Sequence, residues 1–405
     1  MTKLECKQNV KKLYYFGFFW MFLVIIPVLV PYFINLGLNM RQIFQLQAIF
    51  GISVAIMELP SGYLCDIWGR KNTIVLGSFL AGVGYTLLVT LNNFEHLVFY
   101  EILVACSLSL ISGADISLLF DSCHEEKEVK VCKKKILANL QLYKTSAESI
   151  ASIIGGVLVL SSFSHVLVTQ ALISWIPFFI ALTLKEPPYI KMPRSQHLEN
   201  FKNIWGQVFK TSYLRLIFLN LVIWGLATYT AVWIFQKYWM EQGINIAYFG
   251  LLWAGHNIVV GVVGKFVPAL ERRYGFMPMI IFASFLPIIG YLGMAYLTGW
   301  MGIAIGLSFK VARSINQVLL NDAFNANIPG TFRATANSLV SLFFRLGFFI
   351  LGPLVGYGID KFGISFTLSN LGFFFLLLNI VIVLPLSLVT LRAQKQPPLN
   401  TLANA

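Results

Sequence analysis

The sequence predicts an all-α integral membrane protein with twelve transmembrane helices in two pseudo-symmetric six-helix halves. Three observations lead to this fold class: the apolar composition, the recurrence of long apolar runs, and the placement of Lys and Arg between those runs. Hydrophobic residues make up 57% of the 405 residues, charged residues 12%, and the mean hydropathy is +0.74. A soluble domain carries about 25% charged residues. Lipid is therefore the expected solvent for much of this surface.

The apolar runs are long enough to cross a hydrocarbon core of about 30 Å at about 1.5 Å per residue. Helix is the expected structure, because a segment in lipid must satisfy its own backbone hydrogen bonds. The first run continues through Pro27 and Pro31, which is too long for a signal-peptide core. We expect spans over residues 13–35, 42–63, 73–91, 97–121, 136–162, 164–184, 212–238, 246–269, 276–296, 299–323, 332–357 and 364–390.

Two connections differ from the short loops. Residues 122–135 are highly charged, and residues 185–211 are rich in Pro and basic residues. The second lies near the middle of the chain, with six spans on either side. We therefore expect an N-terminal half over 1–184, a cytoplasmic linker over 185–211, a C-terminal half over 212–392 and a cytoplasmic tail over 393–405.

The basic residues set the expected orientation. Most of the 30 Lys and Arg residues fall in alternate loops and at both ends, whereas the other set of loops holds only Arg41, Lys237 and Lys361. The cytoplasmic loops of membrane proteins carry an excess of Lys and Arg, so both termini are expected in the cytoplasm. Although the net charge is +13, its dispersal argues against a nucleic-acid surface. The five cysteines show neither zinc spacing nor a disulfide framework, so no metal or cofactor is expected.

A charged motif lies between the second and third spans. It reads Glu58-Leu-Pro-Ser-Gly62-Tyr-Leu-Cys-Asp66-Ile-Trp-Gly69-Arg70-Lys. Gly62 permits close helix packing, Gly69 permits a tight turn, and Asp66 can interact with a helix N-terminus and with Arg70. The run resembles the Gly-x-x-x-Asp-Arg-x-Gly-Arg-Lys loop of the major facilitator superfamily, with Ile67 where that family usually has Arg.

Further residues extend this resemblance. Span four ends in a Ser-Gly-Ala-Asp…Asp-Ser run similar to bacterial drug-exporter-like members, and its Asp121 is expected either to pair with Arg70 or to be a solvated helix end. Gly155-Gly156 matches half of an antiporter signature. The resemblance implies a multi-pass protein of the bacterial inner membrane, monomeric and without cofactor. It also implies a conformational latch between the halves, formed by Gly62, Asp66, Gly69, Arg70 and Asp121.

Ionisable residues inside spans are costly and usually functional. The first half carries mainly acidic ones, including Glu101, and the second carries Lys310, Arg313 and Arg345. We infer an acidic wall that carries a proton and a basic wall that holds a carboxylate or phosphate. Two alternatives remain open: Glu148 pairs with an Arg as a structural lock, or with Lys144 one turn away. The proton-coupling candidates are Glu58, Asp115, Glu148 and His256, the last of which is alternatively a hydrogen-bonded core residue.

The expected activity is secondary active, proton-coupled transport of a small organic solute by alternating access. Efflux of a drug or anionic metabolite is the leading direction, and uptake of a carboxylate-bearing metabolite or siderophore is the alternative. ATP-driven transport is disfavoured because the sequence has no nucleotide-binding loop, and a membrane-embedded enzyme because it has no metalloprotease spacing or catalytic triad. The candidate substrate-binding residues are Trp20, Trp233, Gln236, Asn257, Arg313, Asn316 and Arg345.

Overall fold

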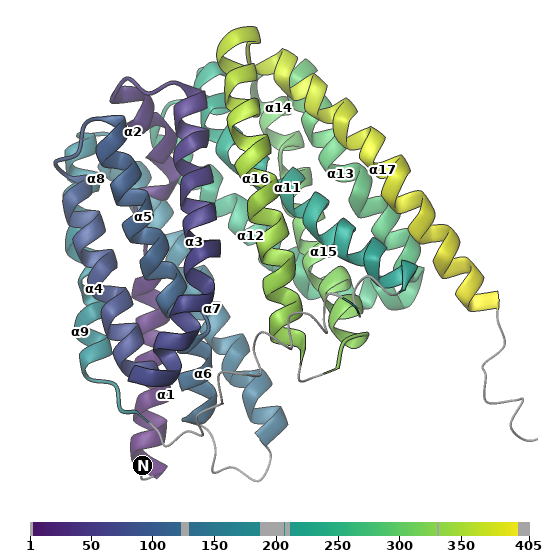
Figure 1. Ribbon diagram of the computed structural model, residues 1–405. Helices are drawn as coiled ribbons and strands as arrows, with labels where there is room; N and C mark the ends of the chain where they lie inside the picture. The colour runs from purple at the N-terminus through teal and green to yellow at the C-terminus, as the bar shows by residue number, and fades with distance from the viewer. Residues whose placement is uncertain (1–2, 123–128, 187–205, 207–210, 330–331, 396–405) are drawn as a thin grey trace, which may run out of the picture. The chain divides into compact units, whose positions relative to one another are not determined.

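The fold is α-helical throughout the part of the chain that the computed structural model describes, which covers residues 3–122, 129–186, 206, 211–329 and 332–395. Figure 1 labels the helices in chain order. The first half contains α1 (Lys3–Trp20), the short 3-10 turn η1 (Ile26–Val28), α2 (Leu29–Asn35), α3 (Met40–Trp68), α4 (Arg70–Leu88), α5 (Phe94–Ile111), α6 (Ala114–Asp121), α7 (Val129–Leu158), α8 (Phe163–Ser174) and α9 (Ile176–Leu182).

The second half begins at α11 (Ser212–Glu241). It continues through α12 (Ala247–Tyr274), α13 (Phe276–Tyr296), α14 (Gly299–Ile305), α15 (Leu307–Ala326), α16 (Arg333–Phe362) and α17 (Ile364–Lys395). Each of the twelve predicted spans coincides with one helix or with consecutive helices, which confirms that these segments are helical. Within the described residues, nine helical stretches are long and apolar enough to cross a membrane.

Four predicted spans are interrupted rather than continuous. The first breaks before η1, where Pro27 occupies the first turn, and the fourth breaks at Gly113, whose φ of 87° suits glycine. The sixth breaks at Trp175 before Pro177, and the tenth at Gly306. Proline removes a backbone donor and glycine weakens a helix interior, so these residues account for the interruptions.

The described chain forms two compact units that do not follow the sequence halves in full. The first unit comprises Met1–Pro193, Gln236–Ile258 and Phe348–Asp360, and the second comprises Arg194–Phe235, Val259–Gly347 and Lys361–Ala405. Short stretches of α11, α12 and α16 therefore belong to the first unit. The predicted domain boundaries remain a prediction, and most of the predicted linker lies outside the described residues.

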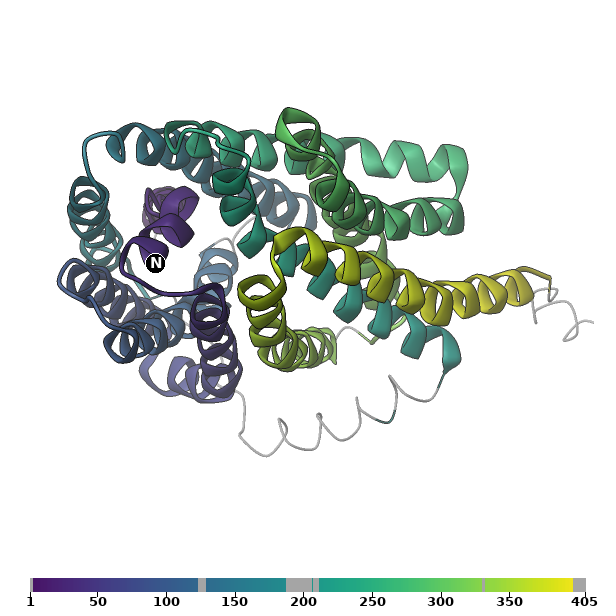
Figure 2. The ribbon, with the colours of Figure 1, turned by 90° about the horizontal axis from the view of Figure 1, so that it is seen from above.

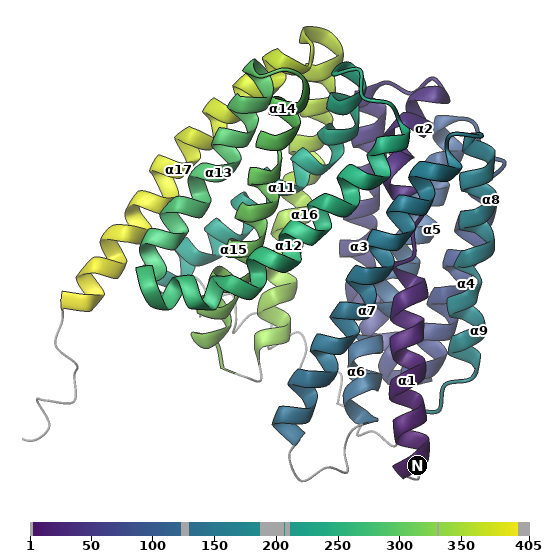
Figure 3. The same cartoon turned by 180° about the vertical axis from the view of Figure 1, so that it is seen from behind.

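Within the first unit, α5 packs against α3 and α4, and α1 packs against α7 and α9. Figure 3 shows α1 between α7 and α9, and Figure 2 shows the same helix seen near its axis, enclosed by its neighbours. An apolar core around Leu13, Phe16, Ile74 and Leu118 joins α1, α4 and α6. We call the end of this unit that carries Gly69 the loop end, and the other the opposite end.

Within the second unit, α13 packs against α15 and α17. Tyr291 of α13 is fully buried, stacks on Phe375 of α17 and donates a hydrogen bond of 2.6 Å to the Ala227 carbonyl of α11. Asn379 of α17 donates to Ser284 of α13. These polar contacts are satisfied inside the unit, as buried polar groups require.

Candidate functional site

The loop-end motif is held by two carboxylates. Gly69 has a φ of 90° and separates α3 from α4. The Glu186 carboxylate accepts hydrogen bonds from the backbone N–H groups of Arg70 (2.8 Å) and Lys71 (2.6 Å), and so caps α4. The Arg70 guanidinium donates to the Ser117 carbonyl at 2.9 Å and forms an ion pair with Asp121. The predicted Arg70–Asp121 pair is confirmed.

A Cβ at Gly62 would meet no described atom within 4 Å, and the close helix packing expected there remains a prediction. Glu186 was not expected at all, although it occupies the place where an anion favours a helix N-terminus. A Cβ at Gly69 would lie 3.1 Å from the Glu186 carboxyl carbon, and the φ of 90° at Gly69 itself favours glycine. The latch role of these residues remains a prediction.

Cys65 lies one turn before Gly69, and its carbonyl accepts the Gly69 N–H at 3.1 Å. Burial raises the pKa of the Cys65 thiol, and the nearby Arg70 guanidinium offsets only part of that effect. The thiolate is the nucleophilic form of cysteine. Cys65 is therefore poorly suited to redox chemistry or covalent catalysis at neutral pH.

At the opposite end, Asp360 caps the N-terminus of α3. Its two carboxylate oxygens accept from the backbone N–H groups of Met40 (2.9 Å) and Arg41 (2.8 Å). The next donor, Gln42 N–H, is taken by the side chain of Asn39 in a capping box. The first turn of α3 thus receives its hydrogen bonds from Asp360 of α16 and from its own cap residue.

Backbones approach closely at the same end of the first unit. A Cβ at Gly356 would lie 2.6 Å from both the Arg41 Cα and the Met40 carbonyl oxygen. A Cβ at Gly250 of α12 would lie 2.1 Å from the Ser152 carbonyl oxygen of α7, and Gly156 of α7 approaches Gly250 in turn. Glycine at these positions permits helix contacts that a larger residue would prevent.

The Gln236 side chain forms the third contact at the opposite end. Its Oε1 accepts from the Val30 N–H and its Nε2 donates to the Ile26 carbonyl, both at 2.9 Å. These are backbone groups exposed by the Pro27 break between α1 and α2. Because both ends of its amide are engaged, Gln236 is better explained as a structural clamp than as a substrate ligand. We call the contacts of Gln236, Gly250, Gly356 and Asp360 the opposite-end seam.

The first unit buries two carboxyl groups with different partners. Asp115, at the start of α6, accepts from Lys144 Nζ of α7 at 2.8 Å and forms an ion pair with it. Glu101 of α5 accepts a hydrogen bond of 2.9 Å from Gln47 Nε2 of α3. Lys144 of α7 therefore pairs with an acid on a different helix, α6. Glu58 and Glu148, the other two acidic candidates, are half-buried on α3 and α7.

In the second unit, polar side chains of α11 and α15 lie at a similar depth along the two helices. The two helices pair antiparallel, since Phe235 contacts Phe309 and Phe218 contacts Phe324. Asn316 and Thr230 therefore lie at similar depth, near the middle of their helices. Asn316 is 7% exposed, and neither its amide oxygen nor its amide nitrogen has a hydrogen-bond partner among the described residues. The Thr230 hydroxyl is likewise unsatisfied within the described part of the chain.

Three basic side chains lie on α15 and α16 of the same unit. Arg313 is exposed on α15, three residues before Asn316, and Arg345 is half-buried on α16, where its Nε donates to Ser341 at 3.2 Å. The neighbouring Phe344 contacts Tyr229 of α11. Lys310 is buried one turn before Arg313, with its Nζ 5.7 Å from the Phe235 ring centre. Sequence reasoning named both arginines and Asn316 and did not select Thr230.

The other candidates lie in more varied surroundings. Trp20 stacks on Phe16 of its own helix, and Trp233 is buried on α11 with its ring 6.2 Å from that of Tyr229. His256 is buried on α12 with its ring 5.5 Å from that of Trp239. Asn257 follows it and is half-buried. His256 and Asn257 fall in the first unit, whereas Trp233, Arg313, Asn316 and Arg345 fall in the second.

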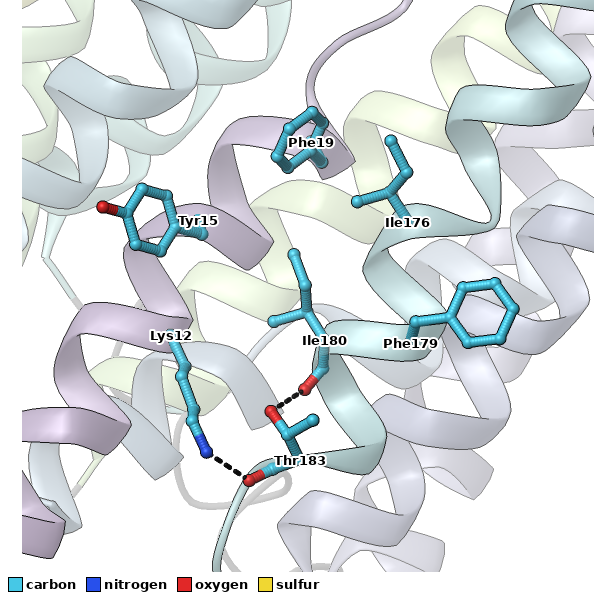
Figure 4. A pocket seen from close by; sticks show the side chains of 7 residues that line it. All are labelled: Lys12, Tyr15, Phe19, Ile176, Phe179, Ile180 and Thr183. Carbon is cyan, nitrogen blue, oxygen red and sulfur yellow. Dashed lines mark hydrogen bonds between the residues drawn. The ribbon is translucent and has the colours of Figure 1, made fainter.

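A groove of about 470 Å³ runs between α1 and α9 in the first unit. Figure 4 shows the apolar side chains that line most of it, and Lys12 at one end donating to the Thr183 carbonyl at 2.7 Å. The lining residues are Lys12, Tyr15, Phe19, Ile176, Phe179, Ile180 and Thr183. With its one charged group already bonded, this groove suits a hydrocarbon chain rather than a polar solute.

Comparison with known proteins matches these features. The family model of the Major Facilitator Superfamily aligns with residues 13–350. An uncharacterized MFS-type transporter of Methanocaldococcus jannaschii is 21% identical over 84% of this chain and 88% of its own. The quinolone resistance protein NorA of Staphylococcus aureus is 22% identical over 84% of this chain and 87% of its own.

Solved structures show the same fold. A variant of the nucleoside transporter NupG superposes with a TM-score of 0.77 at 15% identity, covering 95% of this chain and 98% of that one. The family match spans most of the sequence and agrees with the helical spans and the loop-end motif. The chain therefore belongs to the Major Facilitator Superfamily, as a multi-pass membrane transporter of small solutes.

Proposed function

We propose that the protein is a proton-coupled secondary transporter that exports a drug or metabolite bearing an anionic group, by alternating access. The observation that carries this proposal is Asn316, a buried amide in the middle of a membrane-spanning helix whose hydrogen-bonding groups find no partner among the described residues. Leaving such a group unsatisfied costs about 1–3 kcal/mol. A bound solute that supplies the missing hydrogen bonds would recover this free energy.

The charge near Asn316 supports an anionic group on the solute. Arg313 is exposed near the middle of the span formed by α14 and α15. A guanidinium facing lipid at this depth is costly, so it is expected to face water or a ligand. Arginine binds carboxylates through a planar, bidentate fork. A carboxylate near Arg313, with its polar scaffold against Asn316 and Thr230, is the arrangement that these residues favour.

The opposite-end seam supports alternating access. Within the first unit, it joins parts of α11, α12 and α16 to η1, α2, α3 and α7 through a helix cap, two backbone approaches and a buried amide. These contacts are discrete, so they are either made or broken rather than stretched. We assign them to a closed gate at the opposite end, which must open for solute to pass on that side.

The direction of transport and its coupling to protons are supported by different observations. NorA is described as a quinolone resistance protein, which favours export of a drug, and quinolones carry a carboxylate. Proton coupling is supported by the carboxyl groups buried in the first unit, since proton uptake by buried acids links transport to the gradient. Uptake of a carboxylate-bearing metabolite remains the alternative direction.

The test uses purified protein in proteoliposomes with a quinolone as the probe. An exporter that exchanges protons should move the drug against its gradient when a proton gradient is imposed in the opposite sense, and collapse of the gradient by a protonophore should stop it. An uptake system should move the drug along with the protons instead. Movement that is indifferent to the proton gradient would contradict proton coupling.

A matched pair of variants tests the solute site. Arg313→Ala should weaken quinolone binding, whereas Arg215→Ala, an exposed arginine at the start of α11, should not. Binding is measured by quenching of tryptophan fluorescence in detergent. Undiminished binding by Arg313→Ala would refute the assignment of this residue to the solute anion.

A further inference from the structure

Glu101 is a buried carboxyl group to which neither the solute site nor the loop-end motif assigns a role. It lies on α5, seven residues from the start of the helix at Phe94, or about 10 Å along its axis. Its side chain is 4% exposed, and α5 belongs to a membrane-spanning stretch that ends at Asp121. The carboxyl therefore lies within the hydrocarbon layer rather than at its edge.

The surroundings of Glu101 are neutral. From α3, the Gln47 amide donates to Glu101 Oε1 at 2.9 Å, and Gln47 is itself buried. From α4 and α5, Tyr85 and Tyr100 contact one another with ring centres 5.9 Å apart and interact with Glu101. Tyr32 of α2 also interacts with Tyr100. Phenols remain uncharged at physiological pH.

The contrast with Asp115 is direct. Asp115 faces Lys144 Nζ at 2.8 Å, so its negative charge is neutralised by a cation. The ion pairs found within the described residues do not include Glu101. An unpaired carboxylate inside a membrane is costly, and one amide donor offsets part of that cost only. In this environment the neutral acid is the favoured form.

We propose that Glu101 is the proton-binding site of the first unit, which takes up a proton from water when the opposite-end seam opens and holds it while the seam is closed. The proposal rests on the proposed proton-coupled function and deepens it, because it names the acid. In the uptake step an O–H bond of hydronium breaks, its electron pair stays on the water, and the proton bonds to the Glu101 carboxylate, which becomes neutral. The reverse step, on the loop-end side, returns the proton to water.

The structure also supplies a mechanical link between Glu101 and the seam. Gln47 lies on α3 only seven residues after Met40, whose N–H is bonded to Asp360. A helix segment of this length moves as a rigid body. When the hydrogen bonds between Asp360 and the α3 N-terminus break, α3 can shift and carry Gln47 away from Glu101. Water then gains access to the acid. Gate opening and proton uptake are thereby coupled through one helix.

Infrared spectroscopy of the purified protein detects the protonated acid without any substrate. The difference between wild type and Glu101→Gln should contain the C=O stretching band of a protonated carboxylic acid at neutral pH, shifted in heavy water. Glu95→Gln, an exposed glutamate on the same helix, should give no such difference. Absence of the band from the wild-type minus Glu101→Gln difference would overturn the proposal.

A second variant covers the case in which Glu101→Gln does not fold. Gln47→Leu removes the amide donor and keeps the acid, so the protonated-acid band should remain and move to higher frequency. A band that does not move would show that Gln47 does not contact the protonated acid, which also overturns the proposal.

Transport then separates this proposal from the function on which it rests. In proteoliposomes, Glu101→Gln should keep quinolone exchange down its gradient and lose movement driven by the proton gradient, while Glu95→Gln keeps both. Wild-type protein that ignores the proton gradient would contradict the proposed function. Proton-driven movement that persists in Glu101→Gln would contradict the role of Glu101 alone.

Discussion

Substitution of Gly250 by Ala is expected to open the opposite-end seam. The added Cβ would lie 2.1 Å from the Ser152 carbonyl oxygen and 3.0 Å from its carbonyl carbon. These are backbone atoms, so they cannot rotate away as a flexible side chain would. Overpacking of this kind costs about 1–3 kcal/mol, which corresponds to an about 5- to 150-fold shift away from the closed seam.

Gly255→Ala is the matched control on the same helix. A Cβ at Gly255 meets nothing within 4 Å, so this variant reports only the gain in helix propensity, up to about 1 kcal/mol. The difference between the two variants therefore isolates the packing cost at Gly250. Both residues belong to the first unit.

A reporter thiol measures the open population. In a background with the five natural cysteines replaced by Ser, Ser152→Cys places a thiol at the α7–α12 crossing, where the native side chain is 2% exposed. Its rate of maleimide labelling in detergent follows the open fraction when opening is fast. We expect labelling to accelerate about 5- to 150-fold with Gly250→Ala and to stay unchanged with Gly255→Ala. Equal rates in the two variants would refute the reasoning.

Three further predictions concern the loop end, the buried pair and the solute site. Glu186→Ala should lower the thermal transition more than Asp121→Asn, because a helix cap contributes about 1 kcal/mol and a partly exposed ion pair about 0–1 kcal/mol; the reverse order would contradict the cap. Asp115→Asn and Lys144→Met should each lower the free energy of unfolding by about 3–5 kcal/mol, because each leaves a buried charge without its partner. The double variant should recover most of this loss; strictly additive losses in chemical denaturation would argue against the pair. Asn316→Leu should raise the thermal transition, since it removes unsatisfied amide groups, and abolish quinolone binding; retained binding would contradict the site.

The sequence predicted the helical spans because twenty-residue apolar runs have few other solutions in lipid. It also predicted the Arg70–Asp121 pair, since the resemblance to a known family placed both residues at one membrane face. The span breaks were less visible. Gly113 and Gly306 look like ordinary glycines in apolar runs; Gly113 is distinguished only by its φ of 87°, and Gly306 keeps helical dihedral angles.

The contacts of the seam could not be predicted in the same way. Asp360 bonds to groups 320 residues earlier in the chain, and a carboxylate near a span end is most simply interpreted as a solvated helix terminus. Gln236 was selected as a substrate ligand because an amide in an apolar helix is unusual, yet a broken backbone on another helix satisfies it. Glu186 follows a predicted span end, where a charged residue carries no signal of a distant partner.

The central claim is that the opposite-end seam must open in every transport cycle. Arg41→Cys and Tyr357→Cys, in the cysteine-free background, replace side chains that face each other across the seam, where the guanidinium lies 5.7 Å from the Tyr357 ring centre. A reducible bifunctional thiol reagent should join them. The account predicts that quinolone transport in proteoliposomes stops on cross-linking and returns after reduction. Transport at an unchanged rate through the cross-linked protein would contradict it.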